Sequence, residues 1–398
     1  MLTIDSVYRA KRALEGVARK TDVIYAPKLC PGTELYLKTE NLQVTGSFKV
    51  RGAYYKMTCL SEEEKARGVV ACSAGNHAQG VALAAKKNGI KAVICLPDGA
   101  PISKVEATKS YGAEVCLVEG VYDDAYQKAL QLRDEKGYTF LHPFNDEEVI
   151  AGQGTIALEI MEQLPDVDAV IVPIGGGGLI SGIAYTIKTL NPRVKVYGVE
   201  ASGAPCMKNA LKEGSLATLS SVSTIADGIA VKQPGDLTYE LCNKYVDEIV
   251  TVTDDEISAA ILALMETQKL VTEGAGAVAV AAAMFNKVDL TGKKTVCLLS
   301  GGNIDVTILS RVISRGLLMS GRNCQLRIEL VDKPGQLKNV SRIIADLGGN
   351  VTSVRHERSN EGSDVNGCYL RIVLETRNFE HIEQIRKALQ AEGFKLID

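Results

Sequence analysis

The stretch Ser47-Phe48-Lys49-Val50-Arg51-Gly52-Ala53 places a lysine between an aromatic and a β-branched residue. It follows Thr45-Gly46, a small-residue turn that lets the backbone approach a ligand closely. A desolvated lysine loses its proton more easily than one in water and becomes a carbonyl-seeking amine. Lys49 is therefore a candidate catalytic amine. The simpler alternative is a surface lysine whose ammonium group stays in solvent, and other motifs must decide between the two.

A glycine run, Gly175-Gly176-Gly177-Gly178, follows an apolar strand expected at residues 169–173 and opens a helix expected at 179–190. Residues without Cβ can aim successive N–H groups at one anion, and the positive end of the helix adds to the attraction. A tight turn would need only one glycine. No G-x-G-x-x-G can be aligned across the run, which argues against a nicotinamide cofactor.

Residues 274–279 do fit the looser form G-x-G-x-x-A. However, they follow a helix expected at 254–270, whereas a dinucleotide-binding turn follows a strand. We therefore interpret these residues as a close-packing turn.

Two further motifs lie where strands are expected to end. Ser73-Ala74-Gly75-Asn76-His77 separates a strand at 69–72 from a helix at 78–88, so free N–H groups and a hydroxyl could meet a carboxylate there. Serine and asparagine are also ordinary helix caps. Ser300-Gly301-Gly302-Asn303 follows a strand expected at 295–299.

Together, these segments resemble the pyridoxal-phosphate enzymes of fold type II, and most closely the threonine dehydratases. The resemblance extends over residues 1–320. It implies that pyridoxal 5'-phosphate forms a Schiff base with Lys49 and that Phe48 packs near it, although Phe48 suits a core position equally well. The resemblance also implies that the cofactor phosphate binds at Gly175, Gly176, Gly177 and Gly178, and that Ser300 meets the pyridine nitrogen.

The same resemblance implies that the loop of Ser73, Ala74, Asn76 and His77 binds the substrate carboxylate, with Asn76 also bonding the 3′ oxygen of the cofactor. Lys49 would remove the α-proton as general base, which requires a lowered pKa. The implied reaction is β-elimination of L-threonine to 2-oxobutanoate and ammonia, with L-serine giving pyruvate.

At two positions the residue differs from the one that related enzymes with other activities carry. Serine racemases of the family carry a catalytic serine where Ala74 stands, so alanine favours elimination over racemisation. Racemase-like members bind a divalent cation near Glu200, but Cys206 replaces an acidic ligand, and hard cations prefer oxygen. We expect no metal site, while a monovalent ion stays open. Serine racemase, serine dehydratase, cysteine synthase and a catalytically inactive amino-acid-binding regulator are the alternatives.

Apolar runs without alternation are interspersed with helical stretches, which predicts an α/β fold with both sheet faces covered by helices. The fold type II plan adds two open twisted subdomains within residues 1–320, the smaller (about 45–145) inserted in the larger. Further strands are expected at 92–96, 114–118 and 195–199, and further helices at 103–111 and 123–136.

The pattern of apolar and polar residues changes near residue 320. Residues 325–331 alternate polar and apolar, and the following segments predict a ferredoxin-like βαββαβ order. Asp332-Lys333-Pro334-Gly335 and Gly348-Gly349-Asn350 make residues 324–398 resemble an ACT regulatory domain. The resemblance implies a small-molecule allosteric effector, isoleucine or valine, or else AMP; an oligomerisation module is the alternative.

The charge and the apolar segments of the chain argue against nucleic acid and membranes as partners. The net charge of −3 over 398 residues gives no electrostatic reason to expect nucleic acid or an anionic membrane. The longest apolar stretch, 275–285, is too short to span a bilayer. Ten cysteines without a C-x-x-C pair predict buried free thiols in a reducing compartment. We therefore expect a cytoplasmic enzyme, and the resemblance implies a homotetramer.

Overall fold

The computed structural model describes residues 2–100, 102–358 and 367–397. Met1 and Asp398, the ends of the predicted domains, lie outside this part of the chain. The chain forms two compact units, Met1–Ile308 and Leu309–Asp398, and helix α13 (Val306–Met319) begins in the first and continues in the second. The domain boundary expected at residues 320–324 stays a prediction.

The first unit contains a six-stranded sheet in the order β1-β2-β10-β7-β8-β9. Only β1 is antiparallel to its neighbour; the other pairs are parallel. The strands are β1 Val23–Tyr25, β2 Glu34–Lys38, β7 Ala169–Pro173, β8 Lys195–Ala201, β9 Glu248–Val252 and β10 Lys294–Leu298. The carboxyl ends of the parallel strands therefore meet along one edge, where ligands of open α/β sheets bind.

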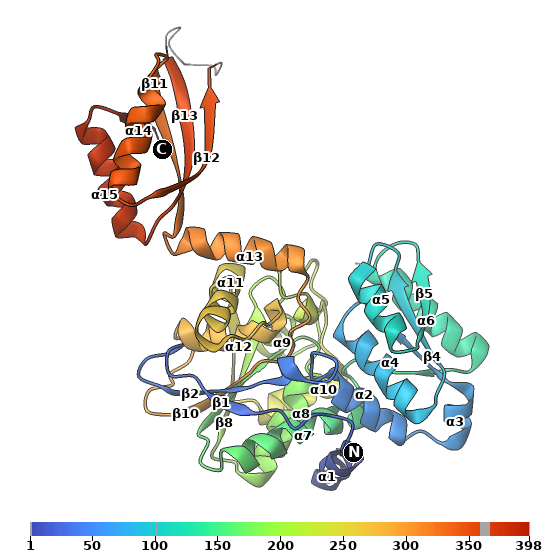
Figure 1. Cartoon of the computed structure of the whole chain (residues 1–398). Helices are drawn as coiled ribbons and strands as arrows, with labels where there is room; N and C mark the ends of the chain where they lie inside the picture. Colours follow the sequence, from blue (N-terminus) through green and yellow to red (C-terminus); the bar gives the residue numbers. More distant parts are fainter. Residues whose placement is uncertain (1, 101, 359–366, 398) are drawn as a thin grey trace. The chain divides into compact units, whose positions relative to one another are not determined.

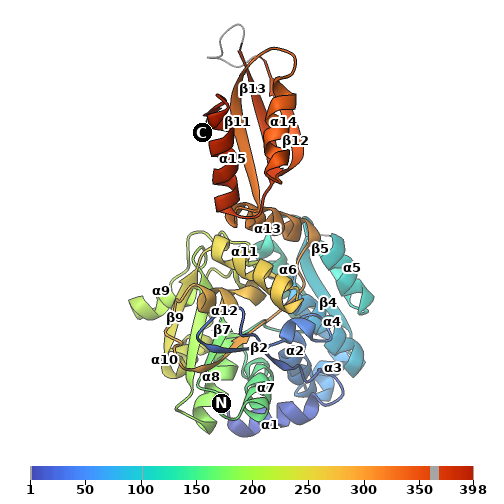
Figure 2. The same ribbon diagram turned by 60° about the vertical axis from the view of Figure 1, so that its left-hand side comes forward.

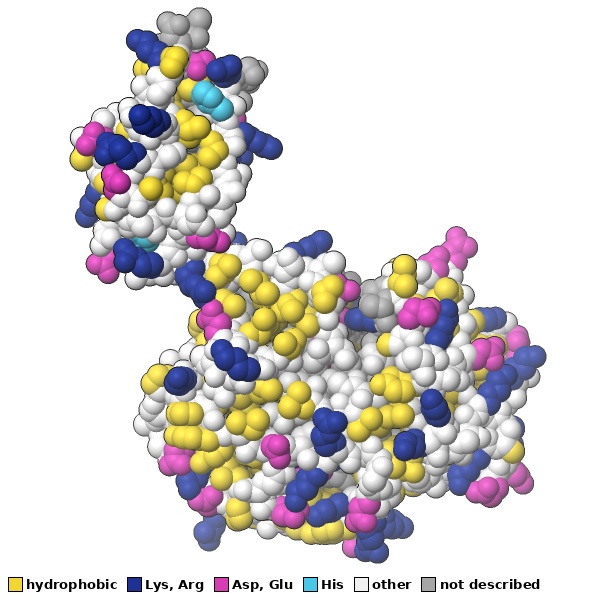
Figure 3. Space-filling model, in the orientation of Figure 1, with side chains coloured by type: hydrophobic (Ala, Val, Ile, Leu, Met, Phe, Trp, Pro, Cys, Tyr) yellow, Lys and Arg dark blue, Asp and Glu magenta, His cyan; other side chains and the backbone are white. Residues whose placement is uncertain are grey.

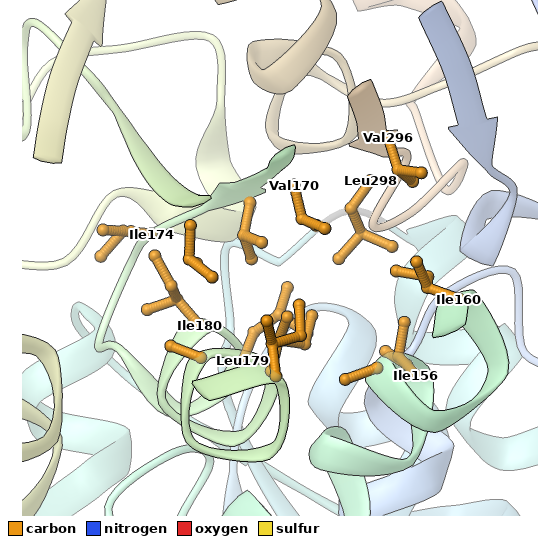
Figure 4. Packing of buried hydrophobic residues seen from close by; sticks show 14 of the residues in the cluster. Ile156, Ile160, Val170, Ile174, Leu179, Ile180, Val296 and Leu298 are labelled. Carbon is orange, nitrogen blue, oxygen red and sulfur yellow. The ribbon is translucent and has the colours of Figure 1, made fainter. Parts of the chain in front are cut away.

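Helices cover both faces of this sheet, with α7 and α8 on one side and α11 and α12 on the other (Figure 1). The helices associated with this sheet are α1 Ile4–Ala13, α7 Glu147–Gln163, α8 Gly178–Leu190, α9 Cys206–Glu213, α10 Asp236–Tyr245, α11 Asp254–Ala263 and α12 Gly274–Met284. Figure 4 shows Ile160 of α7 and Ile180 of α8 packed against side chains of β7 and β10 such as Val170. This double burial explains why the strands read as unbroken apolar runs.

A second, four-stranded parallel sheet has the order β5-β4-β3-β6. Its strands are β3 Val69–Cys72, β4 Ala92–Pro97, β5 Glu114–Val118 and β6 Thr139–Phe140, and its helices are α2 Lys49–Thr58, α3 Glu62–Arg67, α4 Asn76–Asn88, α5 Ile102–Ser110 and α6 Tyr122–Lys136. Alternate residues of β3 face opposite layers: Val69 packs with the α2, α4 and α5 side, and Val70 packs with α6. Two open α/β sheets, as predicted, make up the first unit.

The second unit is a four-stranded antiparallel sheet in the order β12-β13-β11-β14, with two helices on one face (Figures 1 and 2). Its elements are β11 Asn323–Val331, α14 Gln336–Asp346, β12 Asn350–Glu357, β13 Gly367–Glu375, α15 Phe379–Ala391 and β14 Lys395–Ile397. This is the predicted βαββαβ order. Buried and half-buried residues alternate along β13, as a sheet with one solvated face requires.

The interpretation of residues 274–279 as a turn was wrong. They open the buried helix α12, because they belong to a continuous alanine-rich segment that has no exposed face and follows Glu273 at the N-cap position. The close packing expected of the glycines is present: a Cβ on Gly276 would collide with the carbonyl oxygen of Gly301. The helix expected at 254–270 ends as α11 at Ala263 and continues as a π-helical turn, Leu264–Gln268.

A buried ion cluster holds the start of α2. The Arg51 guanidinium binds both oxygens of Glu40 at 2.8 Å and both oxygens of Glu159 at 2.6 and 3.0 Å. Lys38 Nζ lies 2.6 Å from Glu159 Oε2, so two cations compensate two carboxylates. Because the 3₁₀ helix η1 (Glu40–Leu42), α2, α7 and β2 contribute one charge each, the cluster fixes how these elements pack around the segment that carries Lys49.

We predict that Arg51→Met destabilises the first unit by about 3–5 kcal/mol, because it leaves two buried carboxylates with one cation. The midpoint of denaturant unfolding measures the change. Arg133→Met is the matched control, since Arg133 pairs with Asp134 at the surface, and exposed pairs of this kind contribute little to stability. Equal midpoints for the two variants would contradict the role given to the cluster.

Candidate active site

A cavity of about 890 Å³ lies in the first unit and collects the motifs that the sequence singled out. Its lining includes Phe48, Lys49, Ser73, Ala74, Asn76, His77, Gly175, Gly176, Gly177, Gly178 and Ser300. These residues come from α2, α4 and the ends of β3, β7 and β10. The structure therefore brings every candidate residue to one cavity, although their separate roles stay predictions.

Lys49 is the first residue of α2, and its side chain lines the cavity. The Nζ donates to the carbonyl oxygen of Pro143 at 2.9 Å and lies 5.2 Å from the centre of the Phe48 ring. Burial lowers the pKa of Lys49 to about 8, while the carboxylate of Glu273 acts in the opposite direction. A large fraction of this amine is therefore neutral at mildly alkaline pH, unlike an ordinary lysine with a pKa of about 10.4.

The glycine run needs more than one glycine for steric reasons. Gly177 is the N-cap of α8 with φ +95°, a conformation that favours glycine. A Cβ on Gly178 would lie 2.7 Å from the carbonyl oxygen of Phe144, and one on Gly176 would collide with the Phe144 ring. Because the first N–H groups of α8 have no acceptor within the helix, the run presents donors to the cavity.

The loop after β3 prepares another set of donors. Gly75 N donates to Ser73 Oγ at 3.1 Å, and α4 begins at Asn76. The ring of His77 is buried, and its Nε2 lies 3.0 Å from the carbonyl oxygen of Leu141. Burial lowers the pKa of His77 to about 3, with the charge of Lys49 adding to the effect, so this imidazole is neutral. His77 thus contributes its backbone groups and the volume of its neutral ring to the site, and no charge.

Ser300 and Phe48 have structural partners as well. The Ser300 hydroxyl is buried and lies 3.2 Å from the carbonyl oxygen of Ala275, so it must rotate to donate to a ligand. Phe48 lines the cavity and also belongs to the main hydrophobic core. The core position of Phe48 is therefore confirmed, and its packing near the cofactor stays a prediction.

Sequence reasoning missed Glu273. It lines the same cavity, and its Oε1 accepts from Asn76 Nδ2 at 2.7 Å. Burial raises the pKa of Glu273 to about 7, and the charge of Asp227 adds to the effect, whereas the bond from Asn76 lowers it. The only sequence signal was an acidic residue immediately before an alanine-rich stretch, which is equally typical of a helix cap.

The residues around the cavity fit the expected cofactor. A buried amine with a lowered pKa can attack an aldehyde, and a glycine cradle at a helix N-terminus can bind a phosphate dianion. Pyridoxal phosphate carries both groups on one ring. Lys49 would hold its aldehyde carbon, and residues 175–178 its phosphate.

Glu200 does not offer an open cation site in this structure. Its two oxygens accept from the backbone N–H groups of Met207 and Lys208 at 2.8 and 2.9 Å, and Cys206 lies beside it. Among the described residues, the second unit holds one group of three potential ligands, Asp332, His356 and Cys368. Arg358 already pairs with Asp332 there at 3.0 Å.

The cysteines carry no disulfide. All ten are free, and only Cys59 is exposed, in agreement with the sequence prediction. No helix in the described part of the chain is long and apolar enough to cross a membrane. On the face shown in Figure 3, positive and negative side chains are interspersed.

Comparison with known proteins gives two family matches. Residues 14–301 match the pyridoxal-phosphate dependent enzyme family, and residues 325–393 match the ACT domain. An L-threonine ammonia-lyase of Thermotoga maritima is 51% identical over 100% of this chain and 99% of its own length.

Solved structures support the same family assignment. Threonine deaminase isoform 2 of Solanum lycopersicum has a TM-score of 0.75 at 39% identity, covering 79% of this chain and 90% of its own. Maize serine racemase has the same TM-score at 36% identity, covering 80% and 98%. The chain belongs to the pyridoxal-phosphate dependent enzyme family, in the branch of the threonine ammonia-lyases, and carries a C-terminal ACT domain.

Proposed function

We propose that the chain is a pyridoxal-phosphate-dependent threonine ammonia-lyase. It converts L-threonine to 2-oxobutanoate and ammonia, and L-serine to pyruvate. The observation that carries this proposal is the half-buried Lys49, with its lowered pKa, in one cavity with the glycine cradle of residues 175–178. Identity of 51% over the whole chain to an L-threonine ammonia-lyase supports the substrate.

When bound, pyridoxal phosphate supplies a conjugated ring that stabilises negative charge at the substrate Cα. The chain supplies position and proton transfer. Lys49 Nζ takes the proton from Cα, a task for which a pKa of about 8 is suitable, because the neutral amine is available and still basic. The N–H groups of residues 175–178 hold the phosphate end.

The loop after β3 binds the substrate carboxylate. Ser73 Oγ, which already accepts from Gly75 N, still carries a hydroxyl hydrogen to donate, and the N-terminus of α4 adds backbone donors. Asn76 orients the ring through its amide. Ala74 lines the cavity without a proton-carrying group. His77 stays neutral, so it does not compete as a base.

Serine racemase is the second candidate, because maize serine racemase matches this fold as well as the tomato threonine deaminase does. Ala74 argues against it, since a methyl group cannot return a proton to the face of Cα opposite Lys49. The absence of an acidic side chain at Cys206 argues in the same direction. Serine dehydratase activity is part of the proposal, and cysteine synthase activity is the remaining alternative.

The ACT domain supports binding of a small molecule. We propose that this ligand is isoleucine or valine, or AMP, and that it controls the catalytic unit allosterically. Assembly as a homotetramer stays a prediction from the resemblance. Free, mostly buried cysteines support a reducing compartment such as the cytoplasm.

We predict that the purified chain releases 2-oxobutanoate from L-threonine and pyruvate from L-serine, with little D-serine. Lys49→Ala should lower both rates by roughly 10²- to 10⁴-fold or more, because a base and anchor are lost. Lys86→Ala, on the far end of α4, is the control. D-serine as the main product would refute the lyase proposal while leaving the cofactor assignment intact.

We predict that covalent capture of pyridoxal phosphate by the cofactor-free chain rises with pH about a midpoint near 8. Only the neutral amine attacks the aldehyde, and the pKa of Lys49 is lowered, so the neutral form dominates above about 8. Stopped-flow absorbance measures the rate at each pH. A midpoint near 10 would mean that Lys49 is solvated and would remove the basis for its role.

We predict that Gly335→Val abolishes or weakens the response to isoleucine, valine or AMP while the basal rate is kept. Gly335 is the N-cap of α14 with φ +94°, where a β-branched residue costs about 1–2 kcal/mol and distorts the turn. Initial rates with and without each effector provide the measurement. An unchanged response in the variant would exclude this turn as part of the effector site.

A further inference from the structure

Three side chains around the cavity form one hydrogen-bonded line. Asn303 Nδ2 donates to Asn76 Oδ1 at 2.8 Å, and Asn76 Nδ2 donates to Glu273 Oε1 at 2.7 Å. Asn303 Nδ2 also donates to the backbone carbonyl oxygen of Thr45 at 2.8 Å. The line therefore connects the turn before Lys49, the loop after β10, the start of α4 and the cap of α12.

The carbonyl oxygen of Thr45 decides the direction of the whole line. A carboxamide can present either its oxygen or its NH₂ group, but a backbone carbonyl can only accept. Asn303 must therefore turn its NH₂ group to Thr45, and its second N–H reaches Asn76. As a result, Asn76 must turn its oxygen to Asn303 and its NH₂ group to Glu273.

The other end of the line agrees with this direction. Glu273 offers an acceptor oxygen to Asn76 whether it is ionised or carries its proton on the other oxygen. Glycines make room for the arrangement: a Cβ on Gly301 would collide with Glu273 Oε1, and one on Gly46 would collide with Asn303 Oδ1. The direction is thus set by a main-chain acceptor and kept by an acidic side chain.

We propose that Asn303 and Glu273 are positioning residues that force Asn76 to present an N–H, and never its carbonyl oxygen, to the anionic ring oxygen of bound pyridoxal phosphate. Asn76 Nδ2 carries two hydrogens, and within the described residues only Glu273 accepts one of them. The second remains for the ligand. A reversed amide would put its NH₂ group against the NH₂ group of Asn303 and its oxygen against the ionised Glu273 carboxylate, and would weaken cofactor binding.

This inference rests on the proposed cofactor, so its test measures cofactor affinity rather than turnover. Asn303→Asp replaces the donor by an acceptor, so Asn76 must reverse to donate to it. Pyridoxal phosphate should then bind roughly 10- to 150-fold more weakly, the range for a lost hydrogen bond to a charged group. Glu273→Gln keeps an acceptor oxygen for Asn76, so its affinity should stay within about fivefold of wild type.

The double variant Asn303→Asp, Glu273→Gln distinguishes an effect of the orientation of the Asn76 amide from an effect of lost protein stability. The glutamine introduced by Glu273→Gln can donate its NH₂ group to the reversed Asn76, so the denaturation midpoint should recover toward wild type. The cofactor affinity should stay low, because the cavity still faces a carbonyl oxygen. If Asn303→Asp alone does not fold, the double variant carries the test by itself.

Absorbance titration of each cofactor-depleted chain with pyridoxal phosphate gives the dissociation constants. Wild-type affinity in Asn303→Asp, or full recovery of affinity in the double variant, overturns the inference. A loss in Glu273→Gln as large as that in Asn303→Asp also overturns it, because charge and not direction would then matter. If the wild-type chain itself does not bind pyridoxal phosphate, the proposed function fails instead.

Discussion

The site depends on one constraint: an amine must be partly desolvated without an ion partner at contact distance. Lys49 meets it because a neutral acceptor, the carbonyl oxygen of Pro143, satisfies its Nζ, while the Phe48 ring covers one side. A carboxylate in direct contact would keep the amine protonated. Glu273 is close enough to raise its pKa, but Asn76 takes the hydrogen bond of that carboxylate. Desolvation therefore prevails over charge attraction.

Strong charges near the site are placed where they do not touch the amine. Arg51 lies two residues after Lys49 and is fully buried, yet neither carboxylate of its cluster is part of the cavity lining. The cluster acts on Lys49 only through the position of α2. Buried ion networks of this kind are costly to desolvate, and their use here is consistent with a demand for accurate placement of one helix start rather than for stability.

Interior strands such as β3, β4 and β7 were predictable because burial on both sheet faces leaves an unbroken apolar run, as at Ala169–Pro173, whereas β2, β9 and the helix α7 were not predicted. Short or edge strands such as β1 and β6 were not predicted, since two or three residues carry no period. The candidate residues were predictable where glycine or an unusual lysine marks them. Glu273 was not, because its role comes from a contact with a residue 197 positions away in the chain.

Resemblance to a family identifies the residues of the site but not how their side chains are oriented. Motifs identify Asn76 as a ligand-binding residue, but an asparagine in a motif has no direction. Direction comes from Thr45, an ordinary residue whose backbone carbonyl accepts the deciding hydrogen bond and whose side chain does not. The role of such a main-chain acceptor cannot be inferred from the residue type. It can be recognised only in the structure, where loops from distant parts of the chain lie together. The chemistry of this cavity is therefore specified as much by backbone placement as by the side chains that motifs record.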